Sequence, residues 1–185
     1  MPVPRSLRHA QVKMWEVEQL GGLTSSNSSP QSICESVAKI FQVEKTEVAL
    51  LELTGRMLNF LYPPALKTAG AIPLASSSVA ARTARTLQAE LFNSFAEVKH
   101  YSIFELVKLG DTGLDDQVIQ KLMSAPVLAA TGEVMGVIQV SRKAPRPAAA
   151  GPDFTPEDLH KLESVARFVG KLMGKGKGAA HASSG

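Results

Sequence analysis

Residues 124–143, "SAPVLAATGEVMGVIQVSRK", predict a β-hairpin near the end of the chain. Two apolar runs flank a polar turn at Thr131, Gly132 and Glu133. Because both runs stay apolar over long stretches, we expect central strands that are covered on both faces. A glycine inside a strand indicates a bulge or a close backbone approach, and Gly136 is in that position.

A long amphipathic helix is predicted after this hairpin, from "FTPEDLHKLESVARFVGKLMG" at residues 154–174. Thr155 is a suitable N-cap, Pro156 suits the first turn, and Asp158 stands where a capping box has its acid. We expect Gly174 to end the helix and residues 174–185, which are of low complexity, to be disordered. The apolar face comprises Leu159, Leu162, Val165, Ala166, Val169, Leu172 and Met173.

The first half of the chain predicts a helix followed by a second hairpin. Ser29 and Pro30 are a good helix start, and the apolar spacing continues to about Gln42. Residues 48–62 then predict two strands around a Thr54-Gly55-Arg56 turn, where Gly55 can take a positive φ. Two consecutive prolines at 63 and 64 stop the second strand.

The middle of the chain is less regular. We expect a short extended piece at 72–74, a serine cluster that caps a helix over 79–88, and a short strand at 91–92. Residues 96–121 show no single pattern, and residues 4–20 can form a further helix. The order of elements predicts an α+β fold with a central antiparallel sheet of five to six strands and the N- and C-terminal helices on one face. We divide the chain into a helix and linker over 1–29, a domain over 30–173 and a tail over 174–185.

Composition excludes several classes of protein. No apolar run reaches the roughly 20 residues of a membrane helix, and the N-terminus has no apolar stretch typical of a secretory signal. The net charge of +3 comes from five basic residues at the two ends. Without these five of the 20 basic residues, 15 face 17 acidic ones, so we expect no nucleic-acid partner for the folded body. One cysteine favours a reducing compartment, which we take to be the cytoplasm.

Three segments together resemble the GAF domain family over roughly residues 30–173. They are "AIPLASSSVAARTARTLQAELFNS", "APVLAATGEVMGVIQVSRK" and "FTPEDLHKLESVARFVGKLM". The resemblance implies an antiparallel sheet between helices, a small-molecule pocket over the sheet in some members, and a regulatory or sensory role without catalysis. We therefore expect a small-molecule effector or a signalling protein as partner, with no cofactor assigned.

The resemblance places a pocket between the sheet and its covering loops. Ser78 and Arg82 are its polar candidates, because an arginine can hold an anion by a two-pronged contact. The aromatic and apolar candidates are Phe60, Tyr62, Leu74, Val79, Phe92 and Tyr101. A motif of cyclic-nucleotide-binding members is matched only in part: Lys143, Phe154 and Asp158 agree, whereas Arg142 and Leu159 depart. We expect Lys143 and Asp158 to form a structural ion pair instead.

The cysteine and histidine content of the sequence gives little support for a catalytic or a metal site. The GAF-fold enzymes that reduce free methionine sulfoxide use several cysteines, so a redox enzyme remains the disfavoured alternative for a chain with only Cys34. The four scattered histidines predict no metal site. A second alternative is a protein-docking module whose pocket is closed by its own side chains. From the N-terminal helix, which carries Trp15, and the closing helix we expect a homodimer.

Overall fold

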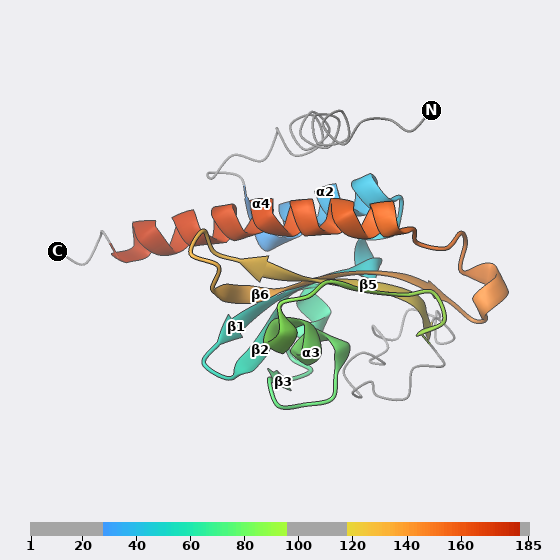
Figure 1. Cartoon of the computed structure of the whole chain (residues 1–185), viewed down its shortest axis with the longest axis horizontal. Coiled ribbons are helices and arrows are strands. Elements are labelled where there is room, and N and C mark those ends of the chain that lie inside the picture. Colours follow the sequence, from blue (N-terminus) through green and yellow to red (C-terminus); the bar gives the residue numbers. More distant parts are fainter. Residues whose placement is uncertain (1–27, 96–117, 182–185) are drawn as a thin grey trace.

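The computed structural model describes residues 28–95 and 118–181, and side chains up to residue 174. Six antiparallel strands form one sheet in the order β3-β2-β1-β6-β5-β4. Helices α2 and α4 cover one face of this sheet, and α3 lies on the other (Figure 1). The predicted α+β fold, with its first and last core helices on one face, is confirmed.

Two hairpins make the body of the sheet. The first consists of β1 (Val48–Thr54) and β2 (Met57–Tyr62), and the second of β5 (Val118–Leu128) and β6 (Val134–Ala144). β1 pairs with β6, so the hairpins join through their inner strands. The short strands β3 (Ile72–Pro73) and β4 (Glu90–Phe92) form the two edges. Long apolar runs in β1 and β6 are therefore explained by cover on both faces.

The predicted caps start the helices. In α2 (Pro30–Phe41) the Ser29 hydroxyl accepts from the Ser32 amide at 3.1 Å. In α3 (Val79–Thr86) the Ser78 hydroxyl accepts from the Ala81 amide at 3.0 Å. This helix ends two residues before the predicted end, because Leu87 adopts the left-handed conformation.

Helix α4 (Pro156–His181) begins as expected and ends later. The Thr155 hydroxyl accepts from the Asp158 amide, and the Asp158 carboxylate accepts from the Thr155 amide at 2.8 Å, which completes a capping box. The predicted end at Gly174 is wrong, since the helix continues to His181. A glycine costs about 1 kcal/mol relative to alanine inside a helix, which alone does not end one.

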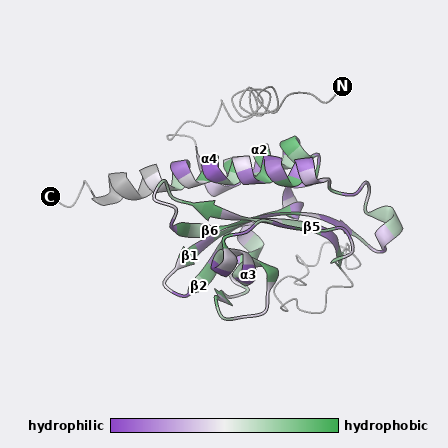
Figure 2. Cartoon of the chain, in the orientation of Figure 1, coloured by the Kyte–Doolittle hydropathy of each residue, from purple (hydrophilic) through white to green (hydrophobic). Residues whose placement is uncertain are grey.

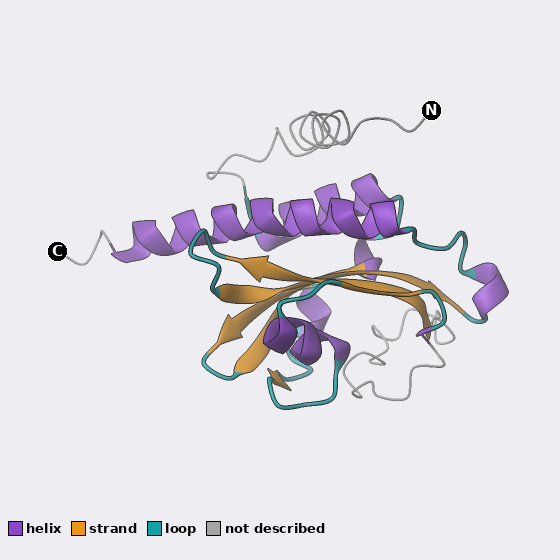
Figure 3. Cartoon of the chain, viewed as in Figure 1, coloured by secondary structure: helices purple, strands orange, loops and turns teal. Residues whose placement is uncertain are grey.

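Short 3-10 helices connect the main elements: η1 (Lys45–Glu47), η2 (Pro64–Leu66) and η5 (Pro147–Ala149) (Figure 3). Among the described residues, no helix has the length and apolar character needed to cross a membrane. The helix predicted over residues 4–20 and most of the unassigned segment 96–121 lie outside the described residues.

The sheet separates two apolar clusters, one on each of its faces. Much of the strand ribbon is coloured as hydrophobic (Figure 2). The larger cluster packs α2 and α4 on the sheet and includes Cys34, Val37, Leu50, Tyr62, Met123, Ile138, Val140, Leu162, Val165 and Val169. The smaller packs α3 on the sheet and includes Leu51, Leu58, Phe60, Ile72, Ala80, Ala81, Ala84 and Val137. Small side chains on α3 let that helix approach the strands closely.

Register shifts alter which residues share a face, one between β1 and β2 and two between β5 and β6. Leu50 pairs with Tyr62 and Leu51 with Phe60, so Leu61 is an extra residue in β2. In the second hairpin the pairing shifts beside Gly136, as that glycine in the sequence predicted. A β-carbon at Gly136 would lie 2.0 Å from the Leu51 carbonyl oxygen, which only glycine avoids.

Candidate functional site

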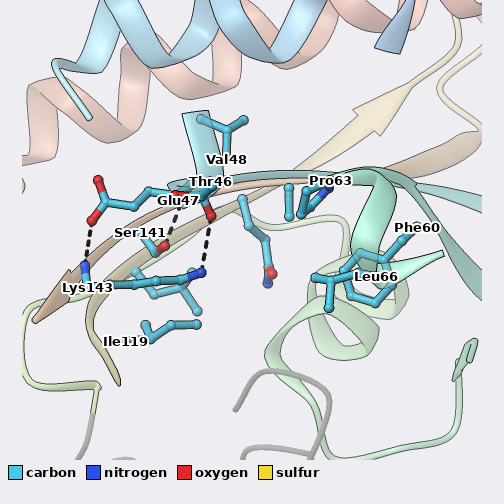
Figure 4. Close-up of a pocket in the computed structure, with 12 residues that line it drawn as sticks. Thr46, Glu47, Val48, Phe60, Pro63, Leu66, Ile119, Ser141 and Lys143 are labelled. Carbon is cyan, nitrogen blue, oxygen red and sulfur yellow. Dashed lines mark hydrogen bonds between the residues drawn. The ribbon is translucent and has the colours of Figure 1, made fainter. Parts of the chain in front are cut away.

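A small hollow lies on the α3 side of the sheet, beside η1 and between the ends of β2, β5 and β6 (Figure 4). Its volume is about 40 Å³. One part of the wall is polar and the other part is apolar. The residues lining it are Thr46, Glu47, Val48, Ala49, Phe60, Pro63, Leu66, Ile119, Leu122, Gln139, Ser141 and Lys143.

Glu47 joins η1 to strand β6 at the polar wall. Its Oε1 accepts from the Lys143 amide at 2.7 Å, and its Oε2 accepts from the Glu44 amide at 2.8 Å. The Ser141 hydroxyl donates to the Glu47 carbonyl oxygen at 3.2 Å. Both carboxylate oxygens thus accept from backbone amides, and the bond to Lys143 holds η1 against β6.

The Lys143 side chain brings a cation to the hollow. Its Nζ donates to the Thr46 carbonyl oxygen at 3.1 Å, and no ion pair joins it to another described residue (Figure 4). Burial lowers the pKa of this amine below its usual value, and the negative charge of Glu47 opposes that shift. The ammonium therefore has a carbonyl partner and no carboxylate partner.

The expected ion pair between Lys143 and Asp158 is not formed. Asp158 caps its own helix, whereas Lys143 bonds to Thr46 on the opposite side of the sheet. Successive residues of a strand face opposite sides, so the residue next to Lys143 faces α4 instead. That residue is Arg142, whose guanidinium lies 4.8 Å from the centre of the Phe154 ring.

Of the predicted pocket residues that the structure describes, Phe60 alone lines the hollow. Tyr62 is buried on the α2 and α4 side, because the bulge at Leu61 reverses the alternation of β2. Leu74 packs against the α3 cluster, and Val79 packs in a third small cluster with Phe95 and Leu122. Tyr101 lies outside the described residues.

The two polar candidates have structural partners. Ser78 is fully buried and caps α3. Arg82 forms a two-pronged ion pair with Glu90, at 2.9 Å from Nε and 2.8 Å from the terminal nitrogen. Its guanidinium also lies 5.6 Å from the Phe92 ring centre. Arg82 thus holds α3 against β4, and neither residue lines the hollow.

Sequence reasoning missed the polar wall. Gln139, Ser141 and Lys143 alternate along an apolar strand, and polar residues repeating at every second position of such a strand line one face of it. That alternation was the available signal. No sequence pattern marked Thr46 and Glu47 as site residues. They reach β6 because η1 directly precedes β1, and β1 pairs with β6.

Buried polar groups fill the space under α3. The Thr83 and Ser124 hydroxyls lie 2.8 Å apart, and the Gln139 amide donates to the Ser124 hydroxyl at 3.3 Å. Thr83 also donates to the Val79 carbonyl oxygen within α3. These groups satisfy one another, and the small hollow lies beside them.

The thiol of Cys34 lies on the other side of the sheet. It has no exposed surface and packs among residues of α2, β1 and α4. Burial, assisted by the negative charge of Glu35, raises the pKa of this thiol to about 12. Within 28–95 and 118–181, no group of three or more histidine, cysteine, aspartate or glutamate side chains is arranged to hold a metal ion.

Comparison with protein families assigns the fold. The GAF domain family matches residues 31–173, which is most of the chain. The chain belongs to the GAF domain family. The hollow therefore lies over the sheet of a GAF domain, on the face opposite the α2 and α4 helices. No protein of curated function matches this GAF domain in sequence.

Solved GAF structures are similar in fold and distant in sequence. The GAF domain of an Acinetobacter phosphoenolpyruvate-protein phosphotransferase is 11% identical at a TM-score of 0.65, with 98% of this chain and 99% of that chain covered. The corresponding domain from Coxiella burnetii is 7% identical at a TM-score of 0.63, with 95% and 99% covered. A free methionine-R-sulfoxide reductase from Neisseria meningitidis, solved with its substrate, is 12% identical at a TM-score of 0.60, with 97% and 96% covered. At these identities the likeness establishes the fold alone.

Proposed function

We propose that this GAF domain is a non-catalytic regulatory domain that binds a small molecule in the hollow beside Lys143. One observation carries the proposal: the Lys143 ammonium, which forms no ion pair with another described residue, lies in a hollow that also has an apolar wall of Phe60, Leu66, Ile119 and Leu122. Binding sites typically combine an apolar lining with a few fixed polar groups. Binding there would tie η1, β2 and β6 together, so occupancy would be transmitted to the sheet.

The alternative is a redox enzyme, because free methionine-R-sulfoxide reductases are among the similar structures. Such chemistry requires a thiolate at the substrate and a second thiol to resolve the disulfide. The chain has one cysteine, and its thiol is buried with a raised pKa on the side of the sheet away from the hollow. These facts favour binding over catalysis.

A docking module with a closed pocket is the second candidate. It is favoured by the small volume of the hollow and by the bonded network of Thr83, Ser124 and Gln139. In that case a signalling protein would be the partner and no small molecule would bind. We also retain the expected homodimer through the terminal helices, which light scattering at micromolar concentration tests directly.

A thermal-shift screen separates the two candidates. The panel contains short carboxylic acids, amino acids, 2-oxo acids, cyclic and other nucleotides, and haem. A ligand at about 100 times its dissociation constant adds roughly 2.7 kcal/mol, which raises the Tm by about 5–10 °C in a domain of this size. A shift that disappears in Lys143→Met supports the small-molecule function. No shift across the panel contradicts it and favours docking.

A further inference from the structure

We propose that the ligand of this hollow is a short monocarboxylate, with its carboxylate on the Lys143 ammonium and its carbon chain against Phe60 and Leu66. This inference rests on the proposed function and specifies its ligand class. Charge, donor count, size and the chemistry of the apolar wall each point to it.

Charge selects an anion. Among the described residues lining the hollow, Lys143 and Glu47 are the charged ones. Both oxygens of Glu47 already accept from backbone amides, which takes up about half of the roughly four acceptor positions of this carboxylate. Lys143 is available, because its amine bonds to a neutral carbonyl. The negative charge of Glu47 offsets only part of the cost of burying this ammonium, since the pKa of Lys143 is still lowered, and a bound anion would relieve the rest.

The number of donors fits one carboxylate. A lysine ammonium has three N–H groups, and the Thr46 carbonyl oxygen takes one of them. Two remain for the two oxygens of a carboxylate. A phosphate dianion would bring more oxygens and a second charge, for which the described wall offers no further cation.

The volume limits the ligand to a few atoms. A single water needs about 10–15 Å³ measured in the same way, so about 40 Å³ holds roughly three to four non-hydrogen atoms. Acetate, with four non-hydrogen atoms, is of this size, and propionate exceeds it by one atom, whereas nucleotides and haem are far larger. The carbon chain would meet Phe60, Leu66, Ile119 and Leu122, which offer no hydrogen bonds to a polar tail.

Isothermal titration with propionate tests the inference on the full chain. Propionamide, which has nearly the same shape and no charge, is the matched ligand control, with sodium chloride at equal ionic strength as the blank. We expect propionate to bind and propionamide to bind at least tenfold more weakly. Equal binding of the two compounds would contradict an anion site.

Lys143→Met tests the residue, and Lys67→Met is the matched control, since Lys67 is an exposed lysine that does not line the hollow. The substitution at 143 keeps the backbone amide that bonds to Glu47. We expect at least tenfold weaker propionate binding in Lys143→Met and unchanged binding in Lys67→Met. Urea unfolding of each variant establishes that it is folded. Unchanged binding in a folded Lys143→Met overturns the inference.

A pH series gives a measurement that needs no variant. The groups facing Lys143 are the Glu47 carboxylate and the uncharged Thr46, Ser141 and Gln139. Burial lowers the pKa of the amine, and a bound anion raises it again. Propionate affinity should therefore fall as pH rises through the pKa of the free amine, with proton uptake on binding. Affinity that does not change with pH over that range overturns the inference.

The inference and the proposed function can fail separately. If propionate gives no heat while another panel compound gives a thermal shift that Lys143→Met abolishes, the function stands and the ligand class is wrong. If neither propionate nor any panel compound binds, both are wrong.

Discussion

Phe60 and Tyr62 lie two positions apart on β2 and face opposite sides of the sheet. Phe60 pairs with Leu51 on the α3 side, and Tyr62 pairs with Leu50 on the α2 and α4 side. The bulge at Leu61 produces this reversal, because a single extra residue changes the face of every residue beyond it. Phe60 therefore reaches the hollow, and Tyr62 lies against the core that contains Cys34.

This relationship predicts different effects on binding for two similar substitutions. Phe60→Leu and Tyr62→Leu each remove a buried ring and should each destabilise the fold by about 1–4 kcal/mol in urea unfolding. Only Phe60→Leu changes the wall of the hollow, so it alone should change the affinity for a bound ligand. Calorimetric titration of both variants checks this, and equal effects on affinity would contradict the assigned faces.

Two glycines of α4 should respond to alanine with opposite signs. A β-carbon at Gly170 would lie 2.0 Å from the Leu128 carbonyl oxygen, where helix and sheet meet. Gly170→Ala should lower the free energy of unfolding by about 1–3 kcal/mol or more, because backbone must move. Gly174 has nothing within 4 Å. Gly174→Ala should raise stability by about 0.5–1 kcal/mol, since alanine favours the helix.

Urea unfolding measures both substitutions, with the wild type as reference. A stabilising Gly170→Ala would mean that α4 does not approach β5 so closely. A destabilising Gly174→Ala would mean that the helix does not continue through this residue.

Cys34 should make stability depend on alkaline pH. Its folded pKa is raised from the usual 9.0 to about 12. Above pH 9 the unfolded chain releases the thiol proton while the folded chain keeps it, so the stability that this group contributes below pH 9 is lost between pH 9 and 12. Urea unfolding at pH 8 and pH 10 should show a larger loss in wild type than in Cys34→Ala.

The same burial predicts how Cys34 reacts. Because the thiolate is the reactive form, native protein should react with iodoacetamide far more slowly than urea-unfolded protein. Equal rates would place the thiol at the surface and would reopen the redox alternative.

The pair between Arg82 and Glu90 should contribute modestly to stability. Both side chains are partly exposed, at 34% and 27%, so water weakens the interaction. A double-mutant cycle with Arg82→Met and Glu90→Gln should give a coupling of about 0.5–1 kcal/mol that declines with added salt. Propionate binding should be unchanged in Arg82→Met, because Arg82 does not line the hollow. Weaker propionate binding in Arg82→Met would indicate that the anion binds near α3 and not in the hollow.

Local patterns predicted much of the fold. The serine caps of α2 and α3, the capping box of α4 and the glycine of the first turn are decided within a few residues, so they were predictable. The end of α4 was not, because a glycine lowers helix stability without preventing a helix.

The candidate site depended on contacts between distant residues. Its polar wall joins Thr46 and Glu47 to Ser141 and Lys143, which lie more than 90 positions away along the chain. Phe60 and Tyr62 were both predicted because aromatic residues on a strand are usual pocket residues, and only Phe60 of the two lines the hollow. The sequence could not place Arg82 away from the hollow, because its partner Glu90 is bonded only once α3 packs on β4.

The sequence by itself determined the alternating strands, the caps, the order of elements and hence the fold class, since each depends on spacing along the chain. Tertiary structure decided which side of the sheet each side chain faces and which polar groups remain available to a ligand. A bulge is visible only in the pairing of two strands, and a charge is occupied or available only when its neighbours are in place. The hollow beside Lys143 depends on the bulge, which turns Phe60 toward it, and on the bonds that hold Glu47 and Lys143 in its wall.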